Sequence, residues 1–167
     1  VKRLVNLSCL ASIPRTTPKR RKSGAQTGLL ISHMQTDSAF CEAYRLLRLK
    51  LLRQLKEEDK ILMVTSSIPS EGKSSVSVNL ALSLAREGKK VLLIDGDLRG
   101  PSDKALLGIT KPSEGLGQCL SGSLDQVHFL RYEDTSLYVF AGSQPIQSPM
   151  NLLQYDKLEA LMNTLRP

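Results

Sequence analysis

Aromatic residues and long apolar runs are both scarce in this chain of 167 residues. There is no tryptophan, and aromatic residues make up only 4% of the chain, which leaves few rings on which nucleic-acid bases could stack. No run of about 18 apolar residues is present to span a bilayer. The sequence therefore argues against a nucleic-acid-binding platform, and it contains no candidate membrane span.

Cysteine and histidine are also rare. Cys9, Cys41 and Cys119 are odd in number and widely scattered, so they show neither the spacing of metal ligands nor a disulfide framework. This usage favours a reducing cytoplasm. His33 and His128 are isolated and are better explained as structural than as catalytic residues.

Acidic residues are absent from the first 36 positions, which hold seven Lys or Arg, whereas positions 37–167 carry equal numbers of bases and acids. The net charge of +7 therefore lies entirely in the leader. Its mixture of Pro, Ser, Thr and basic residues predicts a flexible arm at 1–36, followed by one domain at 37–167. Such an arm could touch an anionic membrane surface, or it could be a solvated tail.

A phosphate-binding loop is indicated after an apolar run at 61–64, which predicts a short buried strand. A loop of small residues follows this run, and helical spacing begins after Lys73. Strand, loop, Gly-Lys-Ser and helix is the context in which backbone N–H groups bind phosphate. The candidate nucleotide-binding residues are Ser67, Ile68, Pro69, Ser70, Glu71, Gly72, Lys73, Ser74 and Ser75.

The residue types of this loop match distinct tasks. Lys73 would reach the terminal phosphates, the Ser74 hydroxyl would bind Mg²⁺, and Gly72 would let the backbone approach the ligand. The strict pattern G-x-x-x-x-G-K-[ST] is missed at one position, because Ser67 replaces the first glycine. Taken alone, Gly-Lys-Ser is also compatible with an exposed turn.

A second motif strengthens the nucleotide hypothesis. The apolar run at 91–94 predicts another buried strand, which leads into Asp95 and Asp97, and Asp95 lies 22 residues after Lys73. The helix between the two runs should end at Gly88, a natural left-handed cap. We expect one βαβ unit in which the strands at 61–64 and 91–94 are parallel.

Apolar spacing predicts four further elements. They are a helix at 38–57, a short helix near 116–120, a strand at 137–140 and a last helix that carries Leu158, Leu161, Met162 and Leu165. Glu42, Arg45 and Arg48 share one flank of the first helix. They are either a solvated face with a weak Glu42–Arg45 pair or a charged seam for a neighbouring subunit.

Four stretches resemble the bacterial tyrosine kinases of capsular and exopolysaccharide synthesis, a P-loop family. Residues 42–48 look like the family's E-x-x-R-x-x-R helix, 67–74 like its Walker A loop, and 92–99 like its Walker A′ motif, hydrophobic-D-x-D-x-R. Residues 141–153 are similar to the segment after the next strand. The resemblance implies a three-layer α/β P-loop fold, with a parallel sheet flanked by helices.

The resemblance also implies an activity, namely ATP- and Mg²⁺-dependent autophosphorylation on tyrosine that regulates polysaccharide synthesis and export. Lys73, Asp95 and Asp97 would be catalytic, with Asp95 as the base. Ser74 and the two aspartates would hold the metal. Protein tyrosines would be the substrates, and no nucleic acid is expected as a partner.

Assembly and location follow from the same resemblance. The helix with Glu42, Arg45 and Arg48 would join identical subunits into an oligomer. Residues 7–14 look like the juxtamembrane stretch of family members in which a membrane-spanning chain-length regulator precedes the kinase. We therefore expect such a regulator as a partner, transmembrane helices upstream of Val1, and a place at the cytoplasmic face of the bacterial inner membrane.

Two departures leave alternatives open. The family's Walker B strand, ending in Asp-x-Pro, and its C-terminal tyrosine cluster are both absent, so the C-terminal part of the domain is expected to be missing. A positioning ATPase of the Par/Min type is one alternative, although such proteins carry an extra lysine where this chain has Ile68. A catalytically incomplete nucleotide-binding interaction module is the other.

Overall fold

The structure is a computed structural model that describes residues 7–15, 30–33, 37–111, 113–122, 127–142 and 144–165. Five α-helices, two 3₁₀ helices and three strands are assigned within these ranges. In chain order they are η1 (Ile31–His33), α2 (Ala39–Gln54), α3 (Lys73–Arg86), β1 (Val91–Ile94), α4 (Asp103–Leu107), α5 (Leu116–Ser121), β2 (Leu130–Arg131), β3 (Leu137–Phe140), η2 (Pro149–Asn151) and α6 (Tyr155–Leu165).

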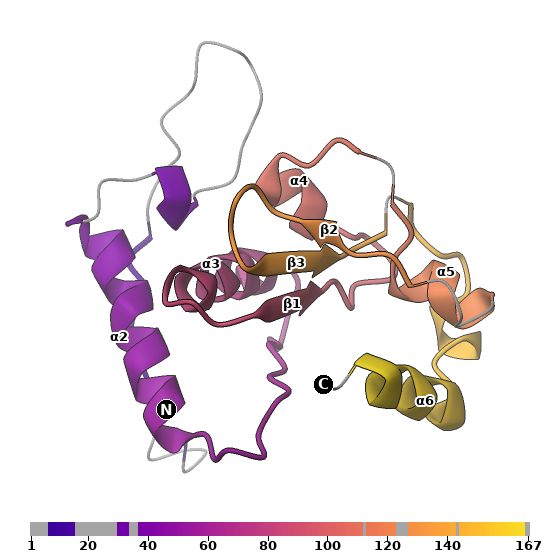
Figure 1. The fold of residues 1–167 in the computed structure, drawn as a ribbon, viewed down its shortest axis with the longest axis horizontal. Helices are drawn as coiled ribbons and strands as arrows, with labels where there is room; N and C mark the ends of the chain where they lie inside the picture. The colour runs from indigo at the N-terminus through magenta and orange to yellow at the C-terminus, as the bar shows by residue number, and fades with distance from the viewer. Residues whose placement is uncertain are drawn as a thin grey trace.

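The sheet is small and mixed, with the strand order β1-β3-β2. β1 and β3 are parallel, in a register that pairs Leu93 with Val139. β2 runs antiparallel to β3. The predicted three-layer α/β fold is confirmed. The β1–β3 pair is the parallel part of the sheet, and the sheet as a whole is mixed because β2 and β3 form an antiparallel hairpin (Figure 1).

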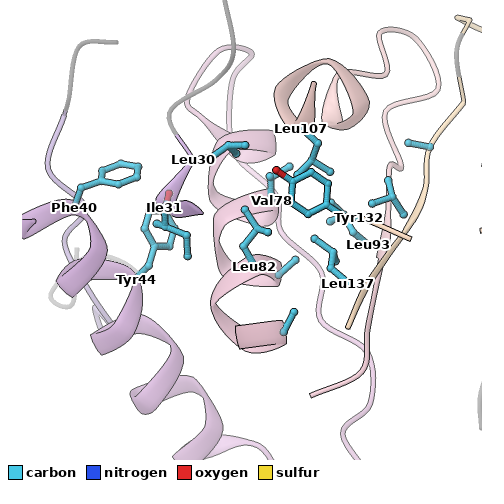
Figure 2. Close-up of a cluster of buried hydrophobic side chains, with 14 residues drawn as sticks. Leu30, Ile31, Phe40, Tyr44, Val78, Leu82, Leu93, Leu107, Tyr132 and Leu137 are labelled. Carbon is cyan, nitrogen blue, oxygen red and sulfur yellow. The ribbon is translucent and has the colours of Figure 1, made fainter. Parts of the chain in front are cut away.

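Alternate residues of β1 and β3 face opposite sides of the sheet, and each side has its own core. Leu93, Leu137 and Val139 pack with α2, α3 and α4, around Val78 and Leu82 of α3 (Figure 2). On the other side, Phe140 packs with α5 and α6, and partly buried Leu92 and Ile94 join this second cluster. Apolar burial on both faces therefore fixes the position of β1, whose carboxyl end leads into the acidic motif.

The strand predicted at 61–64 does not form, and this prediction is wrong. The segment is irregular, and Met63 is 86% exposed, with Ile61 and Leu62 also exposed. A strand needs a neighbour to complete its hydrogen bonds, and none of the described strands pairs with this segment. The predicted βαβ unit is therefore replaced by a parallel pair formed by β1 and β3.

Core packing includes some residues of the predicted arm. Leu30 and Ile31 are 1% and 3% exposed and belong to the main core, and Ile13 packs against it. Apolar side chains embedded in a polar stretch are thus drawn into the core, so packing begins before residue 37. The rest of the predicted arm, at 1–6, 16–29 and 34–36, lies outside the described residues.

The remaining elements agree closely with the sequence patterns. α2, α5, β3 and α6 form where they were predicted, with α2 three residues shorter at its C-terminal end, and Gly88 adopts the left-handed conformation at φ 79°. α4, β2 and the two 3₁₀ helices were not predicted. Within the described ranges, no helix combines the length and apolarity needed to cross a membrane.

Candidate nucleotide-binding site

The phosphate loop leads directly into an open helix N-terminus. α3 begins at Lys73, and no side chain caps it; its N-cap, Gly72, adopts a left-handed conformation at φ 95°. The first amides of a helix have no partner within the helix, and the helix dipole places partial positive charge there. The start of α3 can therefore bind an anion such as a phosphate group.

The front half of the loop is held by one of its own side chains. The Glu71 carboxylate accepts hydrogen bonds from the backbone amides of Ser67 at 3.0 Å and Ile68 at 3.3 Å. Ser70 adopts a left-handed conformation at φ 64°, which turns the chain before Gly72. Because Glu71 engages two of the predicted phosphate-binding amides, the amides left for a ligand are those nearer the start of α3.

The acidic loop after β1 is organised by Asp95. This side chain is 5% exposed, and its carboxylate accepts hydrogen bonds from the backbone amides of Asp97, Ser102 and Asp103 at 3.0, 2.8 and 3.1 Å. It thereby ties the end of β1 to the start of α4. Asp97 is exposed, and one of its oxygens accepts the amides of Arg99 and Gly100.

The two loops meet at Ser74. The Ser102 hydroxyl donates a hydrogen bond to the Ser74 oxygen at 2.9 Å, and the Ser102 amide donates to Asp95. The structure thus brings Ser74 and Asp95 together through Ser102. The meeting point lies at the carboxyl end of β1, where ligands of open α/β sheets bind.

Burial and like charge act on Asp103, the first residue of α4. Asp103 is 3% exposed, and desolvation, followed by the charge of Asp95, raises its pKa to about 7. The hydroxyl of Ser74 lowers this pKa somewhat, and the charge of Asp97 adds to the rise. A buried carboxyl beside two other acids is costly to ionise, and a cation placed nearby would lower that cost.

The donor set fits magnesium rather than a softer metal. Ser74, Asp95, Asp97 and Asp103 offer only oxygen atoms, which Mg²⁺ prefers. Within the described residues, no group of three or more His, Cys, Asp or Glu side chains could by itself hold a metal ion. Mg²⁺ in nucleotide sites usually keeps several waters and takes further ligands from the bound phosphates.

Known proteins were compared with the chain. A family model described as ParA: NUBPL iron-transfer P-loop NTPase matches residues 57–127. The tyrosine-protein kinase CpsD of Streptococcus pneumoniae serotype 4 is 41% identical over 113 residues, which is 64% of this chain and 48% of that protein. AmsA of Erwinia amylovora is 32% identical over 174 residues, 95% of this chain and 24% of that protein.

Solved structures agree. The BceF tyrosine kinase domain superposes with a TM-score of 0.82 at 25% identity, covering 98% of this chain and 69% of that chain. This chain belongs to the bacterial tyrosine kinase family. It spans about half of the length of CpsD and about a quarter of the length of AmsA, so it corresponds to only part of a family kinase. As a P-loop protein it belongs to a nucleotide-binding class.

The three charged residues of the family-like helix α2 lie in different environments. Arg48 is 7% exposed; it donates to the backbone and side-chain oxygens of Ser83 at 2.9 and 3.0 Å and pairs with Glu87 at 2.6 Å. Arg45 and Glu42 form an exposed pair at 3.2 Å. Arg48 therefore binds α2 to α3, and only the other two residues face outward.

Ser102 and Asp103 are the site residues that sequence reasoning missed. They follow Pro101 in a stretch interpreted as loop because of its Gly, Ser and Pro content. The available signal was local: Ser-Asp before an apolar run, with Gly108 after it, marks the start and end of a short helix. Gly108 has the expected left-handed φ of 70°.

Proposed function

We propose that this chain is the nucleotide-binding part of an ATP-dependent protein tyrosine kinase that regulates capsular or exopolysaccharide synthesis and export. One observation carries the proposal: the Ser74 hydroxyl lies against the loop held by Asp95, so phosphate-binding and acidic motifs share one site. Sequence similarity to CpsD supports the choice of reaction.

The residues divide the work as follows. Bound ATP supplies the phosphoryl group, and Mg²⁺ neutralises charge on its phosphates. Lys73 and the first amides of α3 would hold the phosphates, and Ser74 would bind the metal directly. Asp97, exposed at the mouth of the site, and Asp95 would hold metal-bound water, with Asp95 the predicted base for the tyrosine hydroxyl. Removing Asp95 would also release Ser102 and Asp103.

A second copy of the chain is the proposed partner of α2. Beside the exposed Glu42–Arg45 pair, Leu46, Leu49 and Leu52 are 50%, 40% and 38% exposed, so this face of α2 combines charge with apolar surface. Arg48 would act indirectly, by fixing α2 on α3. A membrane-spanning chain-length regulator is proposed as a further partner, because residues 7–14 resemble a juxtamembrane stretch. The kinase would then lie at the cytoplasmic face of the inner membrane.

The experiment compares Lys73→Met with Lys90→Met, an exposed lysine after α3. Lys73→Met should abolish ATP binding, measured by calorimetry, without changing the circular dichroism spectrum, whereas Lys90→Met should bind as wild type does. The whole protein should transfer label from ATP to tyrosine. Unchanged affinity in Lys73→Met would remove the loop from the mechanism.

A positioning ATPase of the Par/Min type is the second candidate, because the matching family model carries the ParA name. The two functions differ in the acceptor of the phosphoryl group, which is water in an ATPase and tyrosine in a kinase. Release of inorganic phosphate without phosphotyrosine, from the whole protein, would favour the ATPase.

A further inference from the structure

Tyr155 differs from the other tyrosines of the chain in its exposure. The sequence holds four tyrosines, and all four lie among the described residues. Tyr44 and Tyr132 are 1% and 4% exposed, and Tyr138 is half-buried in the middle strand of the sheet. Tyr155 is 75% exposed. Packing explains the first three tyrosines, but it does not explain Tyr155.

The backbone around a tyrosine decides whether its hydroxyl can reach a ligand held by another molecule. Tyr138 pairs with Leu92 of β1 on one side and with Arg131 of β2 on the other, so it cannot leave the sheet without breaking both ladders. Tyr155 is the first residue of α6, it follows an irregular stretch, and positions 153–157 are all exposed. The ends of helices open at little cost, so this segment can adapt to another surface.

The Tyr155 hydroxyl is held by an exposed contact. It donates a hydrogen bond to the Glu159 carboxylate at 3.1 Å, one turn further along the same helix. Such a bond adds little to stability, because water replaces either partner. The Tyr44 hydroxyl, by contrast, donates to the Ser75 carbonyl between α2 and α3. The Tyr155 oxygen is therefore free to act as a nucleophile once its proton is removed.

The start of α6 lies at the end of the sheet that carries the acidic motif. β1 and β3 both run toward the side of the molecule on which α5 and the start of α6 lie (Figure 1). The segment between β3 and α6 is tied to the acidic loop, because the Ile146 amide donates to the Leu98 carbonyl at 2.8 Å. Tyr155, as the first residue of α6, is thus presented at this end.

The nucleotide site of the same chain is poorly placed to modify this tyrosine. α3, which begins at Lys73, packs with the core on one side of the sheet, whereas α6 packs with the core on the other side. A phosphate held at the start of α3 is therefore separated from α6 by the sheet. The site of a second copy meets no such barrier, because Tyr155 points into solvent.

We propose that Tyr155 is a phosphate acceptor of this kinase, modified by the nucleotide site of a second copy. The inference rests on the proposed function. In the transfer, the Tyr155 oxygen forms a bond to the γ-phosphorus of ATP, the bond from that phosphorus to the β–γ bridging oxygen breaks, and ADP leaves. The phenolic proton passes to Asp95 of the acting copy, the predicted base, and from there to water.

The phosphate would change the surface at the start of α6. It adds about 1.5 to 2 negative charges at pH 7. These charges would lie beside Glu159 and close to Asp156, so the hydrogen bond to Glu159 is lost and the acids repel the phosphate. Tyr155 and Glu159 line a groove together with Ile61, at the start of the apolar run before the phosphate loop. Modification therefore makes this groove more acidic.

The test localises phosphate within one peptide. The whole protein is incubated with ATP and Mg²⁺ and digested with trypsin, which releases residues 132–157 as a peptide that holds three of the four tyrosines. Fragmentation in a mass spectrometer assigns the phosphate to Tyr132, Tyr138 or Tyr155. Tyr155 should carry at least about tenfold more phosphate than either of the others, which must first unfold locally.

Variants give the matched controls. Tyr155→Phe should lower the phosphate on this peptide at least about tenfold, whereas Tyr138→Phe, the same chemical change in the sheet, should leave it within about twofold. Lys73→Met tests transfer between copies, because this variant is expected not to bind ATP. Alone it should stay unlabelled, and mixed with wild type it should be labelled on Tyr155.

Each other outcome has one meaning. Phosphotyrosine elsewhere in the whole protein, with none on Tyr155, overturns this inference alone, as does phosphate spread evenly over the three tyrosines of the peptide. A Lys73→Met copy that stays unlabelled on Tyr155 in the mixture overturns the transfer between copies. A wild-type whole protein that forms no phosphotyrosine at all overturns the proposed function as well.

Discussion

The phosphate loop separates two regions of opposite character. On its C-terminal side, α3 buries Val78 and Leu82 at 0% and 1% exposure against the sheet and α2. On its N-terminal side, the equally apolar segment at 61–64 is irregular and exposed. A helix completes its backbone hydrogen bonds within itself, whereas a strand depends on a neighbour. An apolar run of four residues therefore forms a strand only where a neighbouring strand pairs with it.

The largest expected difference between the two regions concerns one leucine in each. Leu82→Ala should lower the free energy of unfolding by about 3 kcal/mol, because it leaves a cavity between α3 and its neighbours. Leu62→Ala, the same chemical change at 40% exposure, should cost less than about 0.5 kcal/mol. Urea unfolding followed by circular dichroism gives both values. Equal losses would mean that the 61–64 segment is packed in solution.

The next effect tests how firmly α2 is held to α3. Arg48→Ala should cost about 2 kcal/mol, because Ser83 loses two hydrogen bonds in a buried environment, while the half-exposed Glu87 is resolvated at little cost. Arg45→Ala, which removes an exposed ion pair, should cost less than about 0.5 kcal/mol. Thermal unfolding of the two variants measures the contrast, and a reversed order would place Arg48 at the surface.

A smaller effect depends on pH. Burial raises the pKa of Tyr44 to about 12, above its unfolded value near 10. Its contribution to stability is therefore fully present below pH 10 and is lost as the pH rises toward 12. Between pH 9 and 11, wild type should lose about 1 kcal/mol more than Tyr44→Phe, which does not titrate at this position. Urea unfolding at the two pH values checks the difference, and parallel losses would contradict the buried hydroxyl.

The smallest effect lies in the loop itself. Ser70 adopts a left-handed φ of 64°, which a side chain disfavours. Ser70→Gly should therefore raise the free energy of unfolding by about 0.5 kcal/mol. Ser67→Gly, at a position without a positive φ, should lower it slightly. If both glycines act alike in thermal unfolding, the left-handed turn is not present in solution.

The parts of the fold that follow from local pattern were predictable. The helical spacing after Lys73, the left-handed glycine at 88 and the apolar run at 137–140 each predicted an element that the structure contains. These patterns depend on neighbours in sequence. The sheet order and the state of 61–64 depend on which distant segment pairs with which strand, and spacing along the chain carries no such information.

The candidate site divides in the same way. Residue types identified Lys73, Ser74 and Asp95, because phosphate and magnesium chemistry requires them. They did not identify Ser102, whose hydroxyl reaches Ser74 because the fold places the start of α4 beside the start of α3. Nor did they separate Arg45 from Arg48, because residues three apart share one side of a helix, and the packing of α2 on α3 decides which of them is buried.

The side chain of Asn79 has a mechanical consequence. It is fully buried; it accepts from the Ile31 amide at 2.8 Å and donates to the Ser75 carbonyl at 2.8 Å, and the Tyr44 hydroxyl also donates to that carbonyl. A rotation of α2 would therefore pull on the first turn of the phosphate-binding helix. If docking of a subunit on α2 shifts this turn, thermodynamic reciprocity requires that nucleotide binding changes the docking affinity by the same factor. Subunit assembly and nucleotide binding would then be thermodynamically coupled.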